Sequence, residues 1–127
     1  MVLTEVVRQF WMDICNQRWS ALSTYFHADA VIRWHNTNEQ FTVNEFIRIN
    51  EAYPGDWLTD IVRVESTGNS VITAVRVYQE NAPLSFHAVS FFEFRGSRIA
   101  ALDEYWGADE KAPQWRLDQR IGSAIPE

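Results

Sequence analysis

The sequence has one cysteine, one lysine and no long uninterrupted apolar run. Cys15 alone cannot form a disulfide within the chain, and its place on an apolar helical face predicts a buried thiol in a reducing compartment. Lys111 lies in a polar stretch after the last expected strand, which argues against Schiff-base chemistry. Because no apolar run has the length of a signal peptide or a membrane span, we expect a cytoplasmic protein with no membrane partner.

Basic residues are also scarce, with 11 Lys and Arg against 17 Asp and Glu and a net charge of -6 at pH 7. An acidic domain without a basic stripe binds nucleic acid poorly, so no nucleic-acid partner is expected. The chain has neither a glycine-rich phosphate loop nor a nucleophile elbow, and its histidines and acids lack the close spacing of metal ligands. We therefore expect no metal and no cofactor.

Aromatic residues, by contrast, are plentiful: six Trp, eight Phe and four Tyr in 127 residues. The overall composition is typical of one globular domain over residues 1–127, which is long enough to bury a core without disulfides. Rings in this number suit either a bulky core or an aromatic-lined cavity, and composition leaves both open.

The first half of the chain predicts helices and one strand. We expect Thr4 to be an N-cap and Ser20 to cap a second, shorter helix, while "DAVIRWHN" (29–36) is typical of a strand. Thr42 and Glu45 have capping-box spacing, which predicts a third helix ended by "YPG" (53–55). The apolar face of the first helix would hold Val6, Val7, Phe10, Trp11, Ile14, Cys15 and Trp19.

The second half changes to strand periodicity. Four strand-like runs, 57–66, 70–80, 84–94 and 97–107, are separated by short connections rich in turn residues. Helices followed by an antiparallel meander predict an α+β fold with the helices on one sheet face. The core would cover about 5–108, and the tail 109–127 would begin a short helix near Pro113.

Alternation sorts the last two strands into faces. The inward row of the third long strand is expected to be Phe86, Ala88, Ser90, Phe92 and Phe94, and that of the last strand Ala100, Leu102, Glu104 and Trp106. The opposite face carries Val89, Phe91, Asp103 and Tyr105. Val89, Phe91 and Tyr105 are apolar enough to predict a homodimer through this outer face. Scattered apolar residues on an ordinary surface are the alternative.

The order of elements, with "DAVIRWH" (29–35) early and "RIAALDEYW" (98–106) late, resembles the NTF2-like superfamily. The chain is most similar to the SnoaL-like branch, relatives of ketosteroid isomerases and polyketide cyclases, and to a bacterial subgroup of it. The resemblance implies a cystatin-like cone, in which N-terminal helices wrap a curved antiparallel sheet around an apolar pocket. It also implies dimers through the sheet and proton-transfer chemistry on small molecules.

The resemblance also allows the signature groups of ketosteroid isomerases to be placed on this chain. Their general base falls at Trp34, their donor tyrosine at Phe10 and their protonated acid at Ser90. An isomerase needs a base for the α-proton and donors aimed at the enolate oxygen, and Trp and Phe supply neither. Standard ketosteroid isomerase activity is therefore not expected.

Glu104 is the main catalytic candidate, because a carboxyl on an otherwise apolar strand face has a raised pKa. The alternative is a structural acid paired with Arg33 or with a helix N-terminus. His35 is the candidate for an assisting base at the pocket mouth, or else a loop histidine bound to backbone. The expected ligand-binding residues are Trp34, Trp57, Ser90, Phe92, Leu102 and Trp106, and Asn36, Asn38 and Asn50 could supply orienting amides.

These residues predict a protein with a pocket for a small apolar or aromatic molecule. It would be an enzyme doing acid/base chemistry of an isomerase, cyclase or hydratase type with Glu104. A non-catalytic binding module is one alternative. A structural or protein-interaction dimer whose pocket is filled by side chains is the other.

Overall fold

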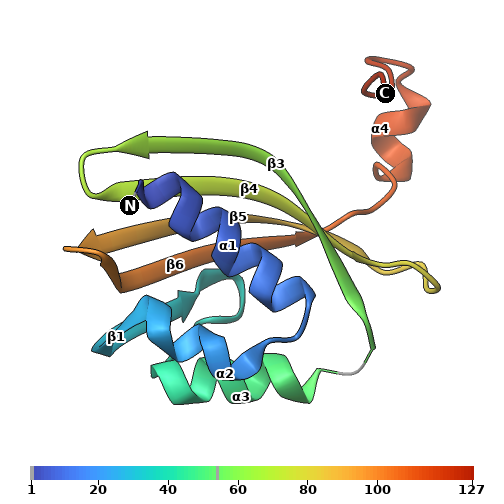
Figure 1. The fold of residues 1–127 in the computed structure, drawn as a ribbon. Coiled ribbons are helices and arrows are strands. Elements are labelled where there is room, and N and C mark those ends of the chain that lie inside the picture. Colours follow the sequence, from blue (N-terminus) through green and yellow to red (C-terminus); the bar gives the residue numbers. More distant parts are fainter. Residues whose placement is uncertain (1, 54) are drawn as a thin grey trace.

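The computed structural model describes residues 2–53 and 55–127. A curved six-stranded sheet forms the body, and the helices of the first half lie on its concave side (Figure 1). The elements are α1 (Leu3–Cys15), α2 (Trp19–Leu22), η1 (Ser23–Tyr25), β1 (Phe26–Trp34), η2 (His35–Thr37), β2 (Glu39–Phe41), α3 (Val43–Ala52), β3 (Trp57–Thr67), β4 (Ser70–Gln79), β5 (Ser85–Arg95), β6 (Arg98–Ala108) and α4 (Gln114–Asp118), where η marks one-turn 3₁₀ helices.

The strands lie in the order β2-β1-β6-β5-β4-β3. Strands β3 to β6 form the predicted antiparallel meander, each paired with the next. β1, however, runs parallel to β6, so the sheet is mixed and not antiparallel throughout. A parallel pair requires a long connection, and α3 with the meander provides it between β1 and β6. This pairing places the end of β1 beside the residues of β6 that matter below.

The helix boundaries differ from the expected ones at the N-terminus. α1 begins at Leu3 with Val2 as its N-cap, so Thr4 lies inside the first turn. The helix ends at Cys15, because Gln17 adopts a left-handed conformation with φ of 57° that interrupts it. Arg18, and not Ser20, is the N-cap of α2.

α3 begins as predicted. The Thr42 hydroxyl accepts a hydrogen bond from the Glu45 backbone at 3.2 Å, and the Glu45 carboxylate accepts one from the Thr42 backbone at 2.9 Å. The helix ends at Ala52, and Pro54 of the expected stop lies outside the described residues.

An aromatic core fills the space between the helices and the sheet. The Phe10 ring lies within 5.3 to 6.4 Å of five other rings, measured between centroids. These neighbours come from α1, η1, β1, α3 and β5, so one side chain ties the helical layer to the sheet. They are Trp11, Tyr25, Phe26, Phe46 and Phe92.

The inward rows follow the predicted alternation except at one place. On β5, Ala88, Ser90, Phe92 and Phe94 are buried, as expected. On β6 the register shifts beside Glu93, so that Ile99 and not Ala100 is fully buried opposite Phe94. A bulge of this kind reverses the alternation locally and cannot be seen in a single strand's pattern.

The C-terminal tail leaves the sheet after β6 and projects away from it (Figure 1). It contains α4, which follows Pro113 as predicted. In the part of the chain that the structure describes, no helix combines the length and apolarity needed to cross a membrane.

Candidate functional site

Glu104 lies at the centre of the sheet's concave face and is only 1 % exposed. The register of β6 places it opposite Trp34 on β1 and Ser90 on β5. The Trp34 indole Nε1 donates to Glu104 Oε1 at 3.0 Å, and the Ser90 hydroxyl donates to Oε2 at 2.5 Å. Both carboxyl oxygens are therefore held by neighbouring strands, and Arg33 is not the partner.

The polar row continues across the sheet. Thr73 on β4 lies opposite Ser90, and Trp11 of α1 donates its indole N–H to the Thr73 hydroxyl at 3.2 Å. Polar side chains thus occupy one level of four neighbouring strands, β4, β5, β6 and β1, within an otherwise apolar core. A buried polar row is tolerated because each member has a hydrogen-bond partner: Ser90 and Trp34 bind Glu104, and Trp11 binds Thr73.

Burial raises the pKa of the Glu104 carboxyl above its usual range, although the bonds from Ser90 and Trp34 act in the opposite direction. An indole N–H can only donate, so Oε1 remains an acceptor in both protonation states. The titrating proton must then sit on Oε2, where the Ser90 hydroxyl can rotate to accept it. When the carboxyl is protonated, its proton therefore has one defined position.

A cavity of about 360 Å³ opens beside this carboxyl. Its volume lies within the range of small-molecule sites. Five of the six tryptophans line it, together with residues of α1, α3 and the sheet. The lining consists of Trp11, Ile14, Gln17, Trp19, Trp34, Asn36, Thr37, Phe46, Ile49, Asn50, Tyr53, Trp57, Val77, Phe86, Glu104 and Trp106.

Some of the expected ligand-binding residues line this cavity, and others are buried in the core outside its lining. Trp34, Trp57, Trp106 and Glu104 line it. The remaining three, Ser90, Phe92 and Leu102, are fully buried and outside the lining, although Ser90 acts on the cavity through its bond to Glu104. A second hollow of about 550 Å³ over α3 is shallower and has no fully buried residue in its wall.

His35 is placed on the other side of the sheet. Its Nε2 lies 2.7 Å from Asp103 Oδ1, and its ring stacks on Tyr105 with 4.5 Å between centroids. Arg33 joins the same carboxylate at 3.4 Å. These contacts hold His35 in an outer-face cluster, and it is not part of the cavity lining.

Trp106 lines the cavity and also carries an unusual polar group. Its indole Nε1 is buried and has no hydrogen-bond partner among the described residues. An unsatisfied buried donor costs on the order of 1–3 kcal/mol, so such groups are rare without a reason. The strand around it is fixed by Asn36, whose Oδ1 accepts from the Trp106 backbone at 2.7 Å. Asn50 instead donates to the Phe46 carbonyl within α3.

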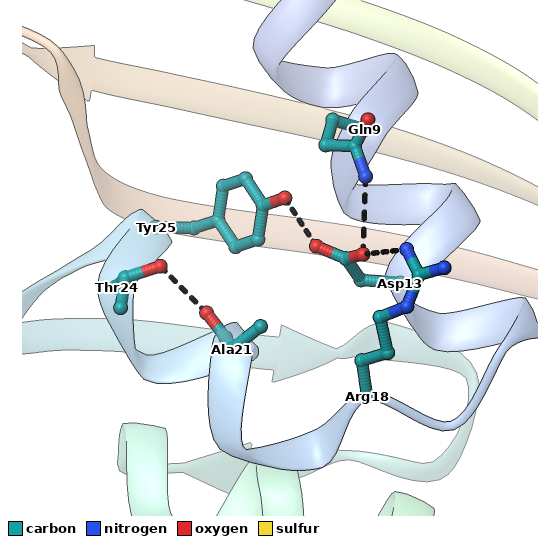
Figure 2. A network of polar contacts seen from close by, with 6 residues as sticks. All are labelled: Gln9, Asp13, Arg18, Ala21, Thr24 and Tyr25. Atoms are coloured by element: carbon teal, nitrogen blue, oxygen red, sulfur yellow. Dashed lines mark hydrogen bonds and ion pairs between the residues drawn. The ribbon is translucent and has the colours of Figure 1, made fainter.

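A second buried acid, Asp13 of α1, lies outside the cavity and was not anticipated from the sequence (Figure 2). Gln9 and Arg18 donate to its Oδ1 at 3.1 and 3.0 Å, and the Tyr25 hydroxyl donates to Oδ2. Burial alone would raise the pKa of Asp13, but the bonds from Tyr25, Arg18 and Gln9 outweigh it and lower the pKa. The network joins the end of α1 to η1.

No group of three or more His, Cys, Asp or Glu side chains within 2–53 and 55–127 is arranged to hold a metal ion. The acids of interest are each held by donors of the protein, as described above.

A curved sheet with helices packed on its concave face and a cavity between the layers defines the NTF2-like class of α+β proteins, as the resemblance implied. The SnoaL-like domain family matches residues 7–102, and the chain belongs to that family. The matched stretch ends just before Glu104. A search of curated proteins finds no significant match.

Solved structures confirm the fold. A putative ketosteroid isomerase from Kribbella flavida has a TM-score of 0.82 at 19% identity, over 98% of this chain and 90% of that one. An epoxide hydrolase of M. tuberculosis has a TM-score of 0.70 at 15% identity, over 83% and 82%. A putative SnoaL-like polyketide cyclase from Shewanella putrefaciens has 0.71 at 12% identity, over 82% and 88%. Proteins of this fold thus include different activities.

Proposed function

We propose that the chain binds a small, largely apolar molecule in the tryptophan-lined cavity and that Glu104 exchanges a proton with it. The observation that carries the proposal is a fully buried carboxyl in the wall of an aromatic cavity. Its pKa is raised by burial, which moves an acid toward the range where it both gives and takes protons near neutral pH.

The surroundings of Glu104 support a reaction of the isomerase, cyclase or hydratase type. Aromatic walls bind a flat apolar body by area and stacking. Trp34 and Ser90 fix the carboxyl, so that proton transfer needs little rearrangement.

The arrangement differs from that of a standard ketosteroid isomerase. Trp34 stands at the position of the general base and donates to Glu104 instead. Phe10, at the position of the donor tyrosine, is fully buried among other rings. Glu104 would have to supply the proton transfer and hydrogen bonding that two acids and a tyrosine supply in those enzymes.

A non-catalytic binding module is the second candidate. It is favoured by one observation: both oxygens of Glu104 already accept hydrogen bonds from the protein. A structural dimer with a filled pocket has less support, because a cavity of about 360 Å³ remains beside the carboxyl.

Ligand binding is tested by titrating a library of aromatic and terpenoid compounds against tryptophan fluorescence. We expect saturable quenching by some members, because five tryptophans line the cavity. Ile14→Trp, which fills the cavity from α1, is expected to weaken binding about tenfold or more. Met12→Trp adds the same ring on the exposed side of α1 and is expected to leave binding unchanged. No saturable response from any compound would contradict the proposal.

We also propose that a second copy of the chain covers the outer face of the sheet. Val89, Phe91 and Tyr105 are 38, 42 and 45 % exposed there. The Phe91 and Tyr105 rings pack edge to face, with 6.0 Å between their centroids. Sedimentation should show a dimer that Phe91→Glu converts to monomers and that Met12→Glu leaves intact. A monomeric wild type would overturn the proposal.

A further inference from the structure

The described lining of the cavity contains one carboxyl and no basic side chain. Glu104 is the carboxyl in its described lining, which contains no Lys, Arg or His. Cations nearby in the fold have other partners: Arg33 binds Asp103, and Arg18 binds Asp13. Glu104 forms no ion pair with a described residue, and only neutral groups donate to it.

The aromatic rings add to this field. The face of an aromatic ring carries partial negative charge and attracts cations, most strongly when the ring is Trp. Five Trp side chains, two Phe and one Tyr surround the cavity beside the carboxyl. A cavity with many aromatic rings and one carboxyl, and with no basic side chain among its described lining residues, favours a positively charged ligand over an anion. A neutral hydrocarbon ligand would gain nothing from the acid.

We infer that the natural ligand carries a basic or cationic nitrogen, as a hydrophobic amine or quaternary ammonium compound, with Glu104 as its counter-ion. The inference rests on the proposed function, since it names the class of molecule that the same cavity takes. An uncharged tertiary amine would accept the proton of Glu104 Oε2, so that ammonium and carboxylate form together inside the cavity. A quaternary ammonium ion would instead cause that proton to leave to solvent.

The other clusters of ionisable side chains have partners of their own and lie away from the cavity. The cluster of Ser85, His87 and Asp109 lies on the outer face of the sheet, where its groups bind one another. Asp13 is fully satisfied by three donors away from the cavity. Among the buried carboxyls of the described chain, Glu104 is therefore the one without positive charge beside it.

A pair of compounds with the same shape tests the inference. Benzyltrimethylammonium and neopentylbenzene differ only in having a cationic nitrogen or a neutral carbon at the centre of the branched group. At about pH 8 we expect the cation to bind at least about tenfold more tightly, by calorimetry or tryptophan quenching. Equal or tighter binding of neopentylbenzene would overturn the inference and leave the proposed function standing.

Glu104→Gln identifies the group responsible. It is expected to weaken benzyltrimethylammonium binding by about tenfold or more and to leave neopentylbenzene binding unchanged. Asp103→Asn removes one negative charge from the same strand, but on the outer face, and should change neither. An equal loss in both variants would show an effect of net charge and overturn the inference. If neither compound binds the wild type, the inference fails, and the library titration decides the proposed function separately.

Discussion

Replacing Glu104 by glutamine is expected to lower kcat for the cavity's substrate by about 10²–10⁴-fold, while the fold and the binding of uncharged compounds are retained. Glutamine has nearly the shape of the protonated acid. Its carbonyl oxygen can still accept from Trp34 and its amide can donate to Ser90, so the buried polar row stays satisfied. What is lost is the proton that Oε2 exchanges. The measurement is kcat and KM on any substrate found by the library titration.

Two further variants test whether the loss of turnover arises from the Glu104 carboxyl itself. Ser90→Ala removes the partner of Oε2, and we expect a smaller fall in kcat with a shifted pH profile, because the proton is then held less well. Asp103→Asn on the outer face should leave kcat unchanged. Full turnover by the glutamine variant would contradict a proton-transfer role. Binding without conversion of any compound by the wild type would favour the non-catalytic module.

Glu104→Gln is also expected to change how the free energy of unfolding depends on pH. The folded state raises the pKa of Glu104 above its unfolded value of 4.5. The favourable contribution of the Glu104 carboxyl to the free energy of unfolding is therefore complete below about pH 4.5. It is lost as the pH rises through the folded-state pKa. Between the two pKa values the wild type should lose about 1.4 kcal/mol per pH unit relative to Glu104→Gln. Denaturant unfolding of both proteins from about pH 4.5 to 9 measures this difference.

Asp13→Asn is the matched control, because Asp13 is also buried, at 4 % exposure, but its pKa is lowered. Its contribution is present above its unfolded value of 3.8 and is lost only as the pH falls. This variant should be less stable than the wild type by a constant amount over the same pH range, about 1–3 kcal/mol for the disturbed hydrogen bonds. Parallel curves for the Glu104→Gln variant and the wild type would mean that Glu104 ionises as easily when folded as when unfolded.

The site was predictable from the sequence where one strand's own periodicity decides the outcome. Glu104 shares a face with Leu102 and Trp106 by alternation, and the structure places it inward as expected. Ala100 fails the same rule, because a bulge beside Glu93 turns Ile99 inward. A bulge depends on two strands together, so the pattern of one strand does not show it.

Partners of the acids were less accessible to sequence reasoning. Arg33 was a reasonable partner for Glu104, yet it binds Asp103 with His35, because neighbouring residues on a strand point to opposite faces. Trp34 and Ser90 hold Glu104 through the pairing of β6 with both β1 and β5. The parallel pairing with β1 joins residues 70 positions apart, and no local pattern predicts it.

By itself, the sequence determined the class of fold, the four-stranded meander, the capped third helix and the side of the sheet on which Glu104 lies. These follow from periods of two and 3.6 residues and from local capping, which act over a few neighbouring positions. Only the tertiary structure decided that Glu104 is held by Trp34 and Ser90, that five tryptophans surround a cavity, and that no basic side chain of the described residues lines it. Such facts depend on which distant segments pack together, and packing is a property of the whole chain.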